Sequence, residues 1–93
     1  MRHFIITKFK KDFNYKSELE NITKIFEKVK DIEGVEDVII HTSNSTRENR
    51  SHIMIEIILT NEGLKNYDIS EPHHEWKDTY GEYIESKAIF DCE

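Results

Sequence analysis

The chain has 93 residues, and its 13 Lys and Arg against 19 Asp and Glu give a formal net charge of −6 at pH 7. This acidic balance argues against binding the phosphate backbone of nucleic acids and against docking on anionic membranes, because both need a cationic face. The length fits one domain, residues 1–93, and a domain this small gains from self-association. The single cysteine, Cys92, excludes an internal disulfide. The N-terminal apolar run ends at Ile6, too early for a signal peptide, so we expect a cytoplasmic protein.

The first half of the chain predicts a strand, a helix and a second strand. Residues His3–Phe9 read as a strand in which both faces carry apolar groups. The pattern Ser17-Glu-Leu-Glu20 is typical of a capping box at a helix start. One apolar stripe at spacings of three and four then follows, made of Leu19, Ile22, Ile25, Phe26, Val29 and Ile32. Gly34 is well placed to end this helix, and Val35–His41 reads as the second strand.

The second half predicts a strand, two short helices and a closing strand. Residues 42–50 form a polar loop, and His52–Thr60 alternates as a third strand. Asn61 is placed to cap a short helix that runs through Tyr67. A further helix is expected near Pro72, because proline suits a first helical turn. This last helix carries Trp76, Tyr80, Tyr83 and Ile84, and Ala88–Cys92 reads as the closing strand.

The resulting order, β-α-β-β-α-β, predicts an α+β, ferredoxin-like fold: one four-stranded antiparallel sheet with helices on one face. We expect the helices to cover one set of sheet residues, namely Phe4, Ile6, Ile53, Ile55, Ile57 and Leu59. The other face would then present Ile5, Phe9, Met54, Ile58 and Phe90 to water. A contiguous apolar patch of this kind marks an interface, so two sheets are expected to pack face to face around a cavity.

Four segments in this order resemble the stress-responsive A/B barrel family of dimeric α/β barrels. They are the opening Arg2-His-Phe-Ile-Ile-Thr-Lys-Phe-Lys10, the turn Ile32-Glu-Gly-Val-Glu-Asp-Val38, the block Leu64-Lys-Asn-Tyr67 with Pro72-His-His74, and the closing Ile89-Phe-Asp91. The chain departs from the family block in two ways: Glu71 stands where histidine is common, and one extra residue separates Tyr67 from Pro72.

The resemblance implies a homodimer in which two four-stranded sheets form one barrel. Most members of the family have no established activity, and some are linked to stress or to larger assemblies. A minority are polyketide cyclases in which a tyrosine and a histidine act as acid–base partners. Related dimeric α/β barrels include cofactor-free monooxygenases and haem enzymes, so the fold alone does not decide the function.

The resemblance also indicates candidate site residues. His74 matches the last histidine of the family block and is a candidate general base, the alternative being a helix-start histidine bonded to the backbone. Tyr67 is its candidate catalytic partner or, alternatively, a packing aromatic. His3 and His52 match cavity-lining positions, and by alternation both are expected on the face opposite the helices, where they would otherwise be interface histidines. The expected ligand-binding set is His3, Ile5, His52, Met54 and Trp76.

No cofactor is expected. The adjacent His73 and His74 diverge by about 100° on a helix, so they cannot easily share a metal ion. Three glycines in all leave no room for a glycine-rich phosphate loop. The sequence therefore predicts a homodimer that binds a small apolar or aromatic molecule in the inter-sheet cavity, or serves as an assembly module. Two alternatives remain: a cofactor-independent polyketide cyclase or isomerase with His74 as base, and a monooxygenase-like role on an electron-rich aromatic.

Overall fold

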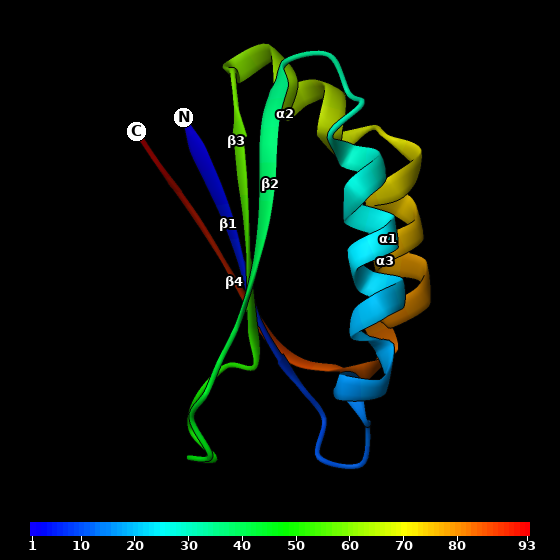
Figure 1. Cartoon of the computed structure of the whole chain (residues 1–93), viewed down its shortest axis with the longest axis vertical. Helices are drawn as coiled ribbons and strands as arrows, with labels where there is room; N and C mark the ends of the chain where they lie inside the picture. Colours follow the sequence, from blue (N-terminus) through cyan, green and yellow to red (C-terminus); the bar gives the residue numbers. More distant parts are fainter.

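The computed structural model describes residues 1–93 as one sheet with a layer of helices on one of its faces (Figure 1). The elements confirm the predicted order, with the second helical region divided in two. In chain order they are β1 (Arg2–Phe9), a 3₁₀ helix η1 (Tyr15–Glu18), α1 (Leu19–Val29), β2 (Val35–Thr42), β3 (Ile53–Leu59), α2 (Asn61–Asp68), α3 (Glu71–Tyr80), a 3₁₀ helix η2 (Gly81–Tyr83) and β4 (Ile84–Cys92).

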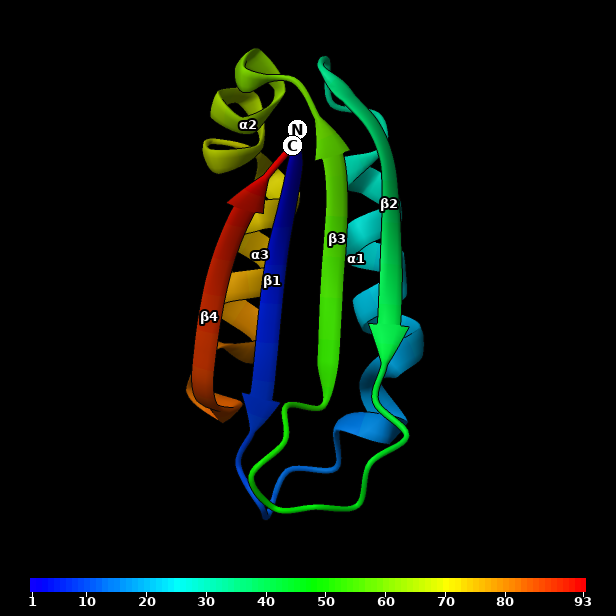
Figure 2. The ribbon, with the colours of Figure 1, turned by 90° about the vertical axis from the view of Figure 1, so that its left-hand side faces the viewer.

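The sheet has the order β2-β3-β1-β4, and every neighbouring pair is antiparallel (Figure 2). Ile5 of β1 lies opposite Ile55 of β3 and Ile89 of β4. Residues that oppose one another in an antiparallel pair share a face, so this row marks one side of the sheet. The neighbouring row, in which Phe4 lies opposite Glu56 and Phe90, marks the other side.

Of the three predicted helix starts, only that of α3, with proline in its first turn, has the predicted chemistry. The Thr60 Oγ1 accepts from the Gly63 amide at 3.0 Å and so caps α2 one residue earlier than predicted. The Ser70 hydroxyl accepts from the His73 amide and caps α3, with proline in the first turn. The predicted capping box before α1 is wrong. Ser17 instead donates to the Asn14 carbonyl, and the chain enters α1 through η1.

Gly34 ends the α1 region as predicted, and it does so with a φ of 93°, a backbone conformation that favours glycine. The turn that it forms lies directly against the first turn of α2. A Cβ atom added at Gly63 would stand 2.3 Å from the Gly34 carbonyl oxygen. The two glycines therefore permit a close approach of two backbone segments, which fixes α2 over one end of the sheet.

The face assignment predicted for β1 is wrong, whereas that for β3 is correct. Ile5 and Phe9 point toward the helices and are only 3% and 1% exposed. Phe4 and Ile6 lie on the uncovered face. His3 shares the helix-covered face with Ile5, so its predicted place opposite the helices is also wrong. The alternation itself is as predicted, but the two faces of β1 are exchanged.

The core lies between the sheet and the helices α1 and α3. Phe26 of α1 meets Trp76 of α3 with ring centroids 5.3 Å apart and an interplanar angle of 67°. The Tyr80 hydroxyl donates to Glu18 at 2.9 Å and accepts from Asn21 at 2.7 Å, which ties α3 to the start of α1. None of the helices is long and apolar enough to cross a membrane.

Candidate functional site

A cavity of about 230 Å³ lies between the sheet and the helices α2 and α3, on the β4 side of the molecule. Its walls include His3, Ile5, Tyr67, His73, Trp76 and Ile89. Lysine side chains from α3 and β4 also border it, together with Asp68. The cavity thus lies inside one protomer, under the helices, and not on the uncovered face of the sheet where the sequence predicted the ligand site.

His3 lines this cavity and is hydrogen-bonded to Asp91. Its Nδ1 lies 2.5 Å from the Oδ1 of Asp91, its cross-strand neighbour on β4. A carboxylate can only accept, so the Nδ1–H of His3 donates and its Nε2 is left as an acceptor in the neutral ring. The His3 side chain is 9% exposed. A carboxylate that fixes the tautomer and orientation of a buried imidazole is the arrangement that general bases use.

Tyr67 lies beside His3, with ring centroids 5.8 Å apart. Its side chain is 1% exposed, and its hydroxyl has no hydrogen-bond partner in the protein. Burial, with a smaller effect from the neighbouring Asp68 carboxylate, raises the pKa of this phenol well above its usual value. The hydroxyl therefore stays protonated at neutral pH and has a hydrogen bond to give.

His73, and not His74, completes this group. Its ring centroid lies 4.6 Å from that of Tyr67. The His73 Nδ1–H donates to the Asp68 carbonyl at 2.9 Å, which leaves Nε2 as an acceptor. His3, Tyr67 and His73 thus bring two imidazoles and one phenol to the same small cavity.

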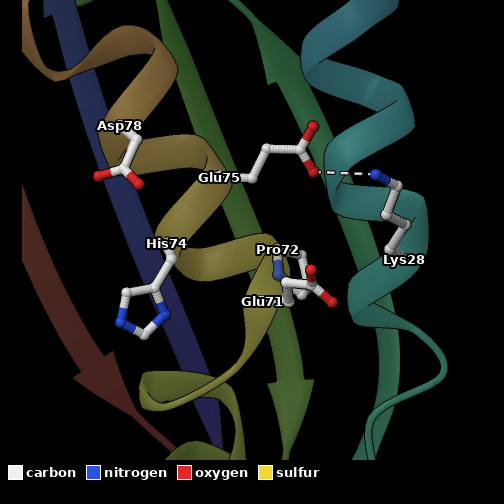
Figure 3. A pocket seen from close by; sticks show the side chains of 6 residues that line it. All are labelled: Lys28, Glu71, Pro72, His74, Glu75 and Asp78. Carbon is white, nitrogen blue, oxygen red and sulfur yellow. Dashed lines mark hydrogen bonds and ion pairs between the residues drawn. The ribbon is translucent and has the colours of Figure 1, made fainter.

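His74 lies on the outer surface of α3 (Figure 3). Its Nδ1–H donates to the Ser70 carbonyl at 2.8 Å, so it is a helix-start histidine bonded to the backbone, the predicted alternative to a general base. It borders an open hollow that also includes Lys28 and Glu75, an ion pair with an N–O distance of 2.9 Å. The structure brings Tyr67 together with His73 and does not bring it to His74.

The remaining predicted site residues are divided between three places. Ile5 and Trp76 line the cavity. Met54 lies on the uncovered sheet face, opposite Ile6. His52 lies at the far end of the sheet, where its Nδ1 accepts from the Phe9 amide at 2.9 Å. His3, His52 and His74 therefore do not share a cavity.

Two residues of the site, His73 and Asp91, were not predicted, although the sequence pattern contains a signal for each of them. His73 precedes Trp76 by three positions and Tyr80 by seven, so it belongs to the inward stripe of α3, whereas His74 does not. Asp91 lies opposite His3 once the first and last strands are paired. No group of three or more His, Cys, Asp or Glu side chains is arranged to hold a metal ion.

The uncovered face of the sheet carries an apolar surface with a charged centre. Its apolar members are Phe4, Ile6, Ile39, Met54, Ile58 and Phe90. Among them, Glu56 pairs with Arg2 and with the Nε2 of His41, the latter at 2.9 Å. The hydrogen bond from His41, supported by Arg2, lowers the pKa of Glu56 against the opposing effect of burial. No element of the chain covers this face (Figure 2).

Comparison with known proteins gives a consistent answer for the fold. No family model matches the sequence, and no curated protein matches it. Among solved structures, a dimeric ferredoxin-like protein of unknown function from Jannaschia has a TM-score of 0.80 at 10% identity, covering 99% of this chain and 96% of that one. A dabb family protein from Mesorhizobium loti has a TM-score of 0.73 at 16% identity, covering 99% and 93%.

The chain has the ferredoxin-like fold of these dimeric proteins. A hydroxynitrile lyase from Passiflora edulis shares the fold as well, with a TM-score of 0.74 at 15% identity and coverage of 96% of this chain and 87% of that one. The predicted fold class is thereby confirmed. Because proteins of different function share this architecture, the role of the chain has to be argued from its own site.

Proposed function

We propose that this chain is a stress-responsive A/B barrel domain protein that forms a homodimer through its uncovered sheet face and holds a small molecule in the cavity of each protomer. The observation that supports the binding role is the hydroxyl of Tyr67, which is fully buried and has no partner in the protein. A buried polar group without a partner costs free energy. A ligand oxygen that accepts from this hydroxyl would remove that cost.

The cavity favours a small ligand with one or two polar oxygens on an apolar or aromatic body. Its volume of about 230 Å³ is below the roughly 300–1,000 Å³ of sites for drug-sized molecules. Ile5 and Trp76 supply apolar walls, and the Tyr67 hydroxyl and the Nε2 of His73 would supply one donor and one acceptor to a ligand that reaches them. A carbonyl or hydroxyl compound matches this combination.

A ligand screen by NMR tests the binding role with matched histidine variants. We expect a panel of small aromatic ketones and phenols to yield hits on the wild type. Those hits should be lost or weakened about fivefold or more in Tyr67→Phe, since a hydrogen bond lost in a buried site costs about 1 kcal/mol or more. His73→Ala should weaken them too, while His74→Ala, a change of the adjacent residue on the outer surface, should leave them intact. Equal losses in both histidine variants would contradict the site.

The dimer is supported by the uncovered face, where Phe90 is 59% and Ile39 is 38% exposed. Contiguous apolar surface of this kind is typical of an interface. We expect light scattering to give about twice the protomer mass of 11.1 kDa at micromolar concentration. Phe90→Glu should return the protein to a monomer, because burying an unpaired charge is costly. The matched control is Ile69→Glu, since Ile69 is 78% exposed but belongs to the helix layer. A monomeric wild type would refute the dimer.

A second candidate function is a cofactor-independent lyase- or isomerase-type enzyme, and the His3–Asp91 pair favours it. In this role a neutral imidazole, His3 or His73, would take a proton from a carbon next to a carbonyl, and the Tyr67 hydroxyl would donate to the carbonyl oxygen. The test is deuterium incorporation into an aromatic methyl ketone in D₂O. Catalysis is supported if deuterium exchange is faster with the protein than in buffer alone and if this acceleration disappears in Tyr67→Phe. If the ketone binds but exchanges at the rate seen in buffer alone, the protein is a binding module and not an enzyme of this type.

A further inference from the structure

A second hollow, of about 480 Å³, lies at the opposite end of the sheet from the cavity of Tyr67. It is formed where the connection after β1 and the long loop between β2 and β3 leave the sheet at the same end (Figure 2). Its volume falls within the roughly 300–1,000 Å³ typical of small-molecule sites. Its lining residues lie in two segments, residues 8–16 and 45–52.

The charge of this hollow is opposite to that of the protein. Five of the 13 Lys and Arg of the chain line it, against one of the 19 Asp and Glu, which is Glu48. The five cations are Lys8, Lys10, Lys11, Lys16 and Arg47. Lys8 is paired with Glu85 at 3.1 Å, and Lys11 with Glu48 at 3.6 Å. The other three have no carboxylate oxygen within 4.0 Å. Unpaired cations gathered around one concavity attract an anion, and do so more strongly as its charge rises.

The wall of the hollow is aromatic. Tyr15 stacks on His52 with ring centroids 4.4 Å apart and an interplanar angle of 18°. Phe9 lies beside both, and Phe13 packs against Phe9 at 5.4 Å. Because the His52 Nδ1 accepts from the Phe9 amide, the proton of the neutral ring is on Nε2, which is a donor. The hollow therefore combines cations, an imidazole donor and flat apolar surface.

We propose that this hollow is a second binding site, which takes a small molecule carrying two or more phosphate groups attached to a planar ring. Lys ammonium groups and an Arg guanidinium are the groups that proteins use to bind phosphate. The ring of the ligand would lie against Tyr15 and Phe13. An exposed ion pair between Lys11 and Glu48 links the two segments that line the hollow.

The probes are ATP, inorganic pyrophosphate, adenosine, citrate and a short single-stranded oligonucleotide, titrated calorimetrically against the full chain at low ionic strength. We expect ATP to bind with a Kd of about 1 mM or tighter, pyrophosphate more weakly, and adenosine not detectably. Raising the salt concentration should weaken ATP binding steeply, because exposed charges are screened. Amide shifts in the NMR spectrum should fall within residues 8–16 and 45–52.

The decisive comparison uses two double variants that change the net charge equally. Lys10→Gln/Lys16→Gln removes two unpaired cations of the hollow, and Lys24→Gln/Lys65→Gln removes two exposed cations elsewhere. The first should weaken ATP binding roughly thirtyfold, since each of the two ammonium groups contributes about 1 kcal/mol in water at close range. The second should change it less than about twofold.

Four outcomes would overturn the proposal. They are no binding of ATP, equal weakening in the two double variants, citrate binding as tightly as ATP, and a short single-stranded oligonucleotide binding far more tightly than ATP. Retention of ATP binding in Tyr67→Phe and His73→Ala is expected, because those residues line the other cavity. The failure of one site is therefore distinguishable from the failure of the other.

Discussion

The substitution Tyr67→Phe should make the protein more stable while it removes ligand binding. The phenol ring is buried between His3 and His73, and its hydroxyl has no partner in the protein. Leaving a buried hydroxyl unpaired costs about 1–3 kcal/mol, whereas phenylalanine keeps the shape of the ring without the polar atom. We expect the free energy of unfolding to rise by about 1 kcal/mol. For a domain of this size, that raises the Tm by roughly 4–8 °C.

Tyr80→Phe is the matched control, because Tyr80 is buried to the same extent and differs in its hydrogen bonds. Both tyrosines are 1% exposed. The Tyr80 hydroxyl donates to Glu18 at 2.9 Å and accepts from Asn21 at 2.7 Å. Its removal should lower the free energy of unfolding by about 1 kcal/mol. The two substitutions, identical in chemistry, should therefore shift stability in opposite directions.

Urea unfolding followed by fluorescence measures both changes. The single tryptophan, Trp76, is 1% exposed in the core and becomes exposed on unfolding. All variants are compared at one protein concentration, since association shifts the apparent stability. Equal dependence on urea concentration would show that only stability has changed. A Tyr67→Phe protein that is less stable than the wild type would refute the reasoning. A Tyr67→Phe protein that is more stable but still binds every ligand of the wild type would also refute it.

Two further predictions concern the backbone and the uncovered face. Gly63→Ala should lower the free energy of unfolding by roughly 1–3 kcal/mol, because its Cβ would stand 2.3 Å from the Gly34 carbonyl oxygen. Gly81→Ala, where nothing lies within 4 Å, should raise it by about 0.4–1 kcal/mol, and urea midpoints decide both. The hydrogen bond from His41 is the first cause of the lowered pKa of Glu56. The ionised carboxylate therefore stabilises the folded state at pH values above the ordinary carboxyl pKa, and this stabilisation is lost as the pH falls through the pKa of Glu56 in the folded state. Glu56→Gln should therefore cost more stability near pH 6 than near pH 3, and an equal cost at both would contradict this linkage.

Most of the fold could be predicted from the sequence because its elements carry local signals. The stripe of α1, the alternation of β3 and the proline in the first turn of α3 each reflect a period or a fixed backbone angle. The exception was β1, where alternation leaves two apolar sets and does not say which faces the helices. The missing information was present in the charges, since Arg2 and Lys8 share the face of Phe4. Cations at both ends of this face of β1 indicate that it is the face that the helices leave uncovered.

The candidate site was predicted only in part because it depends on contacts between distant elements. Tyr67, His3 and Trp76 were recognised as residue types, but their grouping depends on how α2 and α3 lie over the sheet. The choice between His73 and His74 turns on a helical rotation of about 100°. That rotation is set by where the helix begins, at the Ser70 cap. A resemblance at the level of a sequence block is too coarse to resolve it.

Net charge is a sum over the whole chain, and the sum conceals how charges are arranged. A value of −6 argues well against binding a long polyanion, because such a partner meets much of the surface at once. It says little about a small anion, which meets only the few groups within about one Debye length. The side chains that line the hollow are five cations and one carboxylate, and Glu85 lies beside them through its ion pair with Lys8. Acidic side chains elsewhere on the protein would repel nucleic acid while a small phosphorylated molecule still enters this site. The same chain can therefore exclude one class of phosphate ligand and select another.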